Sequence, residues 1–133
     1  MRLSLSRQRG FTLLEMLVVM TILALLTTVG LAGYRTKVRS AKEAVLKENL
    51  FQMNHALEQH RSDRGKYPSS LTPLREFGYL RDIPYDPMTQ SRDTWVTEPE
   101  PPDPDNPDAE LGIWRVRSGS TDLGSNGIPY NEW

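Results

Sequence analysis

An apolar segment from Phe11 to Gly33 contains a single charged side chain, Glu15, and constrains the fold more than any other part of the chain. Its 23 residues would form a helix of roughly 35 Å, which is long enough to cross a bilayer. A carboxylate inside a membrane costs about 2.5–3.5 kcal/mol on insertion scales, so Glu15 should have a task, usually pairing with a cation. Cleavage after Gly10 would provide that cation, because Phe11 would then carry a free amine.

A short basic leader precedes this segment, and the junction reads Gly-Phe-Thr-Leu-Leu-Glu from Gly10 to Glu15. This arrangement resembles the processing site of type IV pilins and type II secretion pseudopilins. In that family a prepilin peptidase of the inner membrane cuts after the glycine and methylates the new N-terminal phenylalanine. The resemblance implies that residues 1–10 are a leader peptide and that Gly10 and Phe11 flank the cut. It also implies that Glu15 pairs with the Phe11 amine of an adjacent subunit in a filament.

Other interpretations of the N-terminal part stay open. A secretory signal peptide could be cleaved after Ala32, although its apolar core would be about 7–15 residues, shorter than the segment here. An uncleaved single-span anchor fits the length, but it explains Glu15 only as a tolerated carboxylate that faces the headgroups. The positive-inside rule does not decide the orientation, because four basic residues between Arg35 and Lys42 outnumber the three leader arginines. The processing motif therefore indicates a cytoplasmic leader and a remainder outside the cytoplasm.

The helix should continue beyond the apolar segment, because residues 34–64 contain neither proline nor glycine and are rich in helix formers. Gly65 fits the position after its last turn. Residues 11–33 are thus predicted as a transmembrane or filament-core helix, and residues 34–65 as the amphipathic half of the same helix. Phe51 lies off the apolar face and is either exposed or in contact with a neighbouring subunit. That face would consist of Val38, Ala41, Val45, Leu46, Leu50, Met53, Ala56 and Leu57, with Asn49 and His60 in the same arc.

The segment from Lys66 to Thr89 is interrupted by prolines and glycines. Thr72 could cap a short helix that has Pro73 in its first position and ends at Gly78. The order of short motifs in this segment resembles the major pseudopilin of type II secretion, in which Tyr-Pro, Gly-Tyr-Leu, Pro and Asp-Pro follow the long helix. The matching residues here are Tyr67-Pro68, Gly78-Tyr79-Leu80, Ile83-Pro84 and Asp86-Pro87.

The C-terminal part predicts short strands and long loops. Residues 94–97 are rich in strand formers, and residues 113–117 alternate, with Trp114 and Val116 on one side. Residues 98–110 contain five prolines and six acids without a base, so they should form a solvated loop or, alternatively, recognise a basic partner. The predicted fold class is α+β, a long N-terminal helix packed on a small antiparallel sheet in a head formed by residues 66–133.

The tail from Ser118 to Trp133 is rich in oxygen ligands and glycine, which is typical of calcium loops. The alternative is a polar loop with a tight turn at Asn126-Gly127. Major pseudopilins bind calcium in their C-terminal loop, and the resemblance implies Ser118 and Asp122 as ligands here. A second acidic ligand is not obvious, and Asn126 or Glu132 would have to serve. Calcium is therefore the one cofactor predicted.

Composition excludes several other classes. There is no cysteine, hence no disulfide and no thiolate chemistry. Removing the three leader arginines from the 16 basic side chains leaves 13 against 17 acidic ones, which argues against broad nucleic-acid binding. His55 and His60 would lie about 140° apart around a helix, which is wrong for two metal ligands on one face, and no nucleophile or phosphate-loop motif occurs. We therefore do not expect an enzyme.

The resemblance implies a subunit that polymerises into the periplasmic pseudopilus of type II secretion. Its partners would be copies of itself, the prepilin peptidase, minor pseudopilins, and an inner-membrane assembly platform with its ATPase. Before assembly the chain would be a single-pass inner-membrane protein with a periplasmic head. The alternatives are a type IV pilin, a minor pseudopilin, or a DNA-uptake pilin that uses the basic residues between Arg35 and Lys42.

Overall fold

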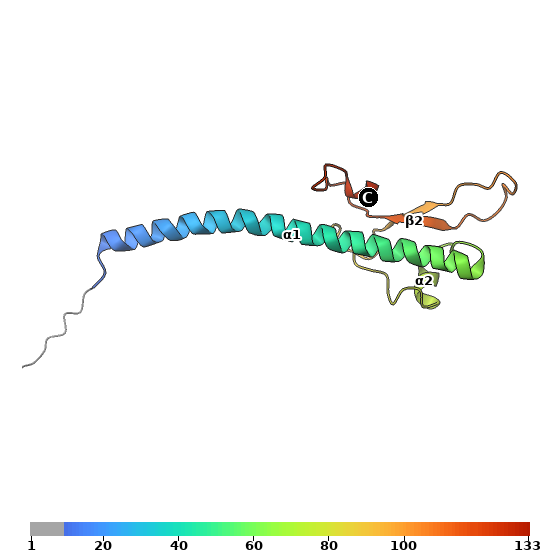
Figure 1. Ribbon diagram of the computed structural model, residues 1–133, viewed down its shortest axis with the longest axis horizontal. Coiled ribbons are helices and arrows are strands. Elements are labelled where there is room, and N and C mark those ends of the chain that lie inside the picture. Colours follow the sequence, from blue (N-terminus) through green and yellow to red (C-terminus); the bar gives the residue numbers. More distant parts are fainter. Residues whose placement is uncertain (1–9) are drawn as a thin grey trace, which may run out of the picture. The chain divides into compact units, whose positions relative to one another are not determined.

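The structure, a computed structural model, describes residues 10–133, so the predicted leader lies outside the described residues except for Gly10. Its elements in chain order are α1 (Leu13–Arg64), α2 (Thr72–Glu76), β1 (Val96–Pro99), β2 (Ile113–Arg117) and a 3₁₀ turn, η1 (Tyr130–Glu132) (Figure 1). The α+β class is confirmed, and the two predicted halves of the long helix are parts of one helix, α1. The chain divides after Val38 into two compact units, of which the second is Arg39–Trp133.

The first unit contains the apolar part of α1. Its residues from Gly10 to Lys37 are all exposed, and an 18-residue window is apolar enough to cross a membrane. Hydroxyl groups in this stretch donate to carbonyls four residues earlier, so they need no water as a partner. These bonds run from Thr21 to Leu17, Thr27 to Leu23, Thr28 to Ala24 and Thr36 to Ala32. The surface of this unit is therefore apolar over most of its length, while these four threonine hydroxyls bond within the helix.

In the second unit, α1 buries one stripe against the head. The stripe follows spacings of three and four residues and consists of Glu43, Leu46, Leu50, Met53, Leu57 and His60, with Ala56 beside it. The predicted face was too wide, because Ala41 and Val45 are exposed and Val38 is half-exposed. Phe51 is 66% exposed, as its position off the face predicts. The remaining core side chains come from the head: Tyr67, Leu74, Leu80, Trp95, Val116 and Tyr130.

Glycines end both helices. Gly65 has a positive φ of 76°, and its N–H donates to the carbonyl of Arg61 at 2.7 Å. Gly78 follows α2 with a φ of 79°. The prediction that Thr72 caps α2 is wrong, because Leu71 occupies the cap position, no side chain caps this helix, and Thr72 is its first residue. The short α2 is held instead by Leu74, which is fully buried.

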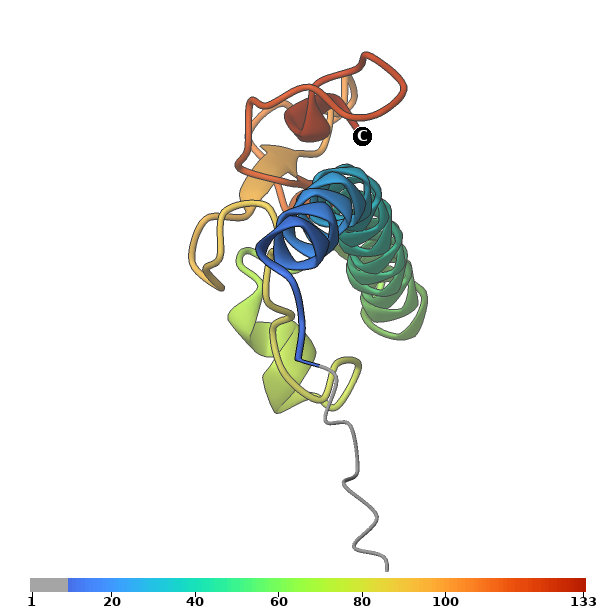
Figure 2. The same cartoon turned by 90° about the vertical axis from the view of Figure 1, so that its left-hand side faces the viewer.

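The sheet has two antiparallel strands, β1 and β2, which flank the second half of α1 together with α2 (Figure 2). The bounds predicted for β2 are confirmed. β1 begins at Val96 rather than residue 94, because Trp95 turns into the core and its indole N–H donates to the Pro84 carbonyl at 2.8 Å. Glu98 and Pro99 were predicted as loop, but they belong to β1. The Glu98 carboxylate forms an ion pair with the Arg117 guanidinium, with 2.7 Å between Oε1 and Nε. Residues 101–110 are all exposed.

Candidate functional site

The predicted processing and assembly residues lie at the start of α1. Gly10 and Phe11 precede the first helical residue and are exposed, Phe11 to 75%. The hydroxyl oxygen of Thr12 accepts a hydrogen bond from the Glu15 N–H at 3.2 Å. Thr12 is therefore the N-cap of α1, and Glu15 is the third helical residue, where a negative charge is favourable beside the helix N-terminus.

This cap is a feature that the sequence reasoning missed. The spacing Thr-x-x-Glu is that of a capping box, and it was visible in the printed sequence at Thr12 and Glu15. The bond that the structure contains runs from the Glu15 N–H to the Thr12 hydroxyl, and it leaves the predicted pairing of the Glu15 carboxylate with the Phe11 amine unchanged. Within the described residues 10–133, no basic side chain forms an ion pair with Glu15. A single chain does not test the pairing between subunits, so that role stays a prediction.

The apolar part of α1 presents a continuous surface of large hydrophobic side chains. Leu13 is 90% exposed and Val29 is 75% exposed, and the large hydrophobic side chains between them are all at least 40% exposed. A soluble monomer rarely exposes a contiguous apolar surface of this kind. Its burial would be strongly favourable, at about 25 cal/mol for each Å² removed from water. Such a surface favours burial, in a bilayer or against other apolar surfaces.

Three predicted calcium ligands lie in different surroundings: Ser118, Asp122 and Asn126. Ser118 is fully buried, and its hydroxyl donates to the Asp86 carboxylate at 2.7 Å. The side-chain oxygen of Asn126 accepts a hydrogen bond from the Ile128 N–H at 3.0 Å within the predicted tight turn, where Gly127 has a φ of 78°. Asp122 is exposed. In residues 10–133 no group of three histidine, aspartate or glutamate side chains is arranged to hold a metal ion.

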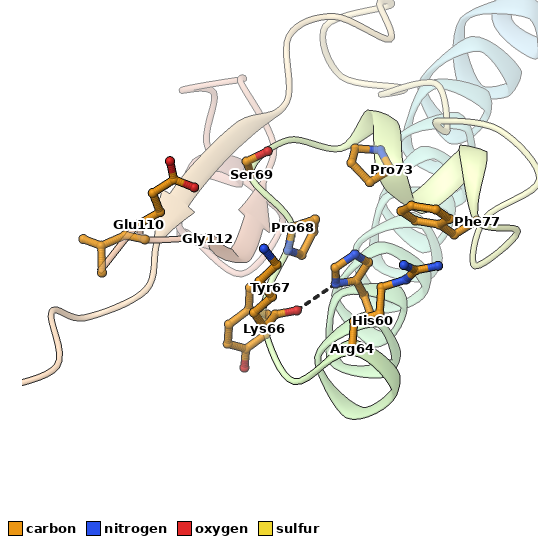
Figure 3. Close-up of a pocket in the computed structure, with 11 residues that line it drawn as sticks. His60, Arg64, Lys66, Tyr67, Pro68, Ser69, Pro73, Phe77, Glu110 and Gly112 are labelled. Atoms are coloured by element: carbon orange, nitrogen blue, oxygen red, sulfur yellow. Dashed lines mark hydrogen bonds between the residues drawn. The ribbon is translucent and has the colours of Figure 1, made fainter. Parts of the chain in front are cut away.

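The head also contains a cleft of about 520 Å³ between the end of α1 and the segment after it (Figure 3). Two of its polar side chains make contacts within the fold: His60 Nδ1 is 2.8 Å from the Lys66 carbonyl, and the Arg64 guanidinium lies 3.5 Å from the centre of the Phe77 ring. His60 is buried, whereas His55 is exposed and stacks on Phe51. The two histidines therefore do not share a site.

Comparison with known proteins agrees with the geometry at the start of α1. Residues 5–31 match the prokaryotic N-terminal methylation motif. The chain thus carries the processing motif of the type IV pilin family, and this confirms the resemblance drawn from Gly10, Phe11 and Glu15.

Three curated relatives of the chain share one name, type II secretion system core protein G. The chain is 27% identical to the type II secretion system core protein G of Dickeya chrysanthemi, over 91% of this chain and 95% of that protein. It is 29% identical to the protein of the same name from Klebsiella pneumoniae, over 62% of this chain and 71% of the relative. The Pseudomonas aeruginosa relative is also 29% identical, over 61% of this chain and 68% of its own length. No solved structure matches the chain significantly.

Proposed function

We infer that the chain is a major pseudopilin, the repeating subunit of the pseudopilus that drives type II secretion. The observation that carries this function is the fully exposed apolar part of α1, which begins directly after the processing motif and has Glu15 in its first turn. Similarity to core protein G over nearly the whole chain supports the same conclusion. The function is assembly rather than catalysis.

The chemistry of assembly follows from the residues at the start of α1. Removal of the leader leaves the Phe11 amine four residues from Glu15, so each subunit carries one cation and one anion near the same end of its helix. Packing of the apolar helices supplies cohesion, because it removes their large side chains from water and lipid. The ion pair between Glu15 and the amine of a neighbouring Phe11 sets the stagger, since a wrong register leaves two buried charges unpaired.

The proposed location is the inner membrane before assembly, with the head in the periplasm. The proposed partners are the prepilin peptidase, the assembly platform with its ATPase, minor pseudopilins and other copies of the chain. The exposed apolar length of α1 fits a membrane anchor, and its threonine hydroxyls at Thr21 and Thr27 bond within the helix.

Substitution of Gly10 tests this function in cells. Gly10→Val should block cleavage, because a branched side chain replaces the glycine beside the cut bond. We expect the uncut precursor to accumulate in the membrane, pseudopili to be absent, and exported proteins to remain in the periplasm. Gly33→Ala is the matched control, since nothing lies within 4 Å of a Cβ added there in the single chain. Normal protein secretion with the uncut precursor would contradict the proposal, and loss of DNA uptake alone would favour a competence pilus instead.

A further inference from the structure

Glu43 is a buried carboxylate on the mostly apolar stripe of α1, with only 6% of its surface exposed. Its Oε1 accepts hydrogen bonds from the Ser125 N–H and the Tyr130 hydroxyl, both at 2.8 Å. Its Oε2 accepts a third from the Ser125 hydroxyl at 2.6 Å. The Arg39 Nε lies 3.4 Å from Oε1, one helical turn before Glu43. These contacts form the Glu43 cluster, which consists of Arg39, Glu43, Ser125 and Tyr130.

The Glu43 cluster strongly favours the ionised carboxylate. The Ser125 hydroxyl contributes most to lowering the pKa of Glu43 from 4.5 to about 2, and the Tyr130 hydroxyl, the Ser125 N–H and the Arg39 charge add to it against the opposing effect of burial. Hydrogen bonds to a charged group are about twice as strong as those between neutral groups. A buried carboxylate with these donors is therefore a firm attachment point for the C-terminal loop.

Further contacts hold the same loop, residues 118–133, on α1. The Arg39 guanidinium donates a hydrogen bond to the Leu123 carbonyl, so this side chain bonds both the carboxylate and the loop backbone. The Lys47 ammonium lies 5.0 Å from the centre of the Trp133 ring. A Cβ added to Gly124 would come within 2.5 Å of Trp133, so the loop is closely packed on its own terminus. The loop is thus attached at its tip and at its end.

The donor atoms predicted for calcium do not fit an ion. Calcium needs 6–8 oxygens that converge on one point. The Ser118 hydroxyl is buried against Asp86 and also accepts a bond from the Ser120 N–H at 3.2 Å. The Asn126 oxygen is occupied within its own turn. Asp122 contributes its backbone to the loop, because its carbonyl accepts a bond from the Tyr130 N–H at 3.0 Å. Asp122 and Glu132 are both exposed, and within residues 10–133 no third acidic side chain joins them in a group that could hold a metal ion.

We propose that the Glu43 cluster holds the C-terminal loop on α1 in place of a metal ion, so that the head folds and stays folded without calcium. Glu43 is then a structural anchor, and the oxygen-rich composition of the loop serves its turns and its hydrogen bonds. The proposal concerns the head alone and is independent of the function in secretion.

The test uses the full processed chain in detergent, with excess EDTA or with millimolar calcium. Thermal unfolding reports the stability of the head, and hydrogen exchange reports the opening of residues 118–133. We expect equal unfolding temperatures in both conditions. Glu43→Gln should lower the unfolding temperature by about 5–10 °C, given about 4–8 °C for each kcal/mol in a domain of this size. It should also speed exchange in the loop at least about tenfold.

Glu48→Gln is the matched control, because Glu48 lies on the exposed side of the same helix and accepts a bond only from Gln52. It should change neither readout. Should Glu43→Gln fail to fold, Tyr130→Phe removes a single hydroxyl from the Glu43 cluster and should still speed exchange in the loop. The proposal is overturned if calcium raises the unfolding temperature and Asp122→Asn abolishes that rise. It is equally overturned if the Glu43 and Tyr130 variants behave like Glu48→Gln.

Stability of the head should also depend on pH in a defined window. The pKa of Glu43 is about 2 in the folded chain and near 4.5 when unfolded, so its contribution is complete above pH 4.5 and is lost as the pH falls toward 2. The groups that face it do not titrate there: Arg39 stays charged, and the pKa of Tyr130 is raised further above 10, chiefly by burial. The difference in unfolding temperature between the parent chain and Glu43→Gln should therefore shrink across this window. A constant difference would show that the ionised carboxylate is not the anchor.

Discussion

Replacing Glu15 by glutamine is expected to leave cleavage after Gly10 intact and to abolish most filament assembly. Breaking a buried ion pair by removing one partner costs about 3–5 kcal/mol, which corresponds to a hundredfold or greater loss of affinity between subunits at about 1.4 kcal/mol per tenfold. Glutamine keeps the length of the side chain and its ability to complete a capping box with Thr12, so the loss reports the charge. Filament yield and N-terminal processing are measured on the same cells.

Thr12→Ala separates the charge of Glu15 from the cap of α1. It removes the hydroxyl oxygen that accepts a hydrogen bond from the Glu15 N–H. Loss of such an N-cap typically costs about 1 kcal/mol of helix stability. Because the carboxylate and the Phe11 amine are unchanged, assembly should fall much less than in Glu15→Gln. Equal defects in the two variants would mean that Glu15 acts through the helix start, and normal assembly of Glu15→Gln would remove the pairing role altogether.

Leu57→Ala is expected to destabilise the head by about 2–5 kcal/mol. Leu57 is fully buried where α1 packs on the head, so truncation removes apolar contacts and leaves a cavity. A head of this size has only a modest core and no disulfide to support it, so such a loss is a large part of its total stability. Denaturant unfolding of the processed chain in detergent, followed by tryptophan fluorescence, measures the change.

Phe51→Ala is the control on the same helix. Phe51 contacts His55 by stacking but is mostly exposed, so its truncation should change the stability of the head by no more than about 0.5 kcal/mol. A loss as large as that of Leu57→Ala would mean that the buried stripe of α1 is misplaced. An assembly defect in Phe51→Ala with normal stability would instead identify a contact with a neighbouring subunit.

Much of the fold was predictable because its strongest determinants are local. The absence of proline and glycine from residue 34 to residue 64 predicts the length of α1, and Gly65 predicts its end. Alternation over residues 113–117 predicts β2. Gly10 and Phe11 were assigned as processing residues from a short motif beside an apolar segment, and that role stays a prediction.

The errors arise where tertiary contacts override local pattern. Glu43 was not assigned to the buried face, although its spacing of three from Leu46 continues the buried stripe. Its donors, Ser125 and Tyr130, lie more than 80 residues later in the chain, and no local pattern links them to Glu43. The bond from the Ser118 hydroxyl to the Asp86 carboxylate was likewise not predictable, because the two residues are distant in sequence. The start of β1 depends on Trp95 reaching the core.

The central claim is that the chain is processed as a pseudopilin and assembles through the new N-terminus. The most direct test is the intact mass of the protein extracted from membranes, together with sequencing of its N-terminal peptide. The account predicts a chain that begins at N-methylated Phe11. A chain that begins at Gly33, or an uncut chain that begins at Met1 in cells with active prepilin peptidase, would contradict it and remove the proposed role of Glu15.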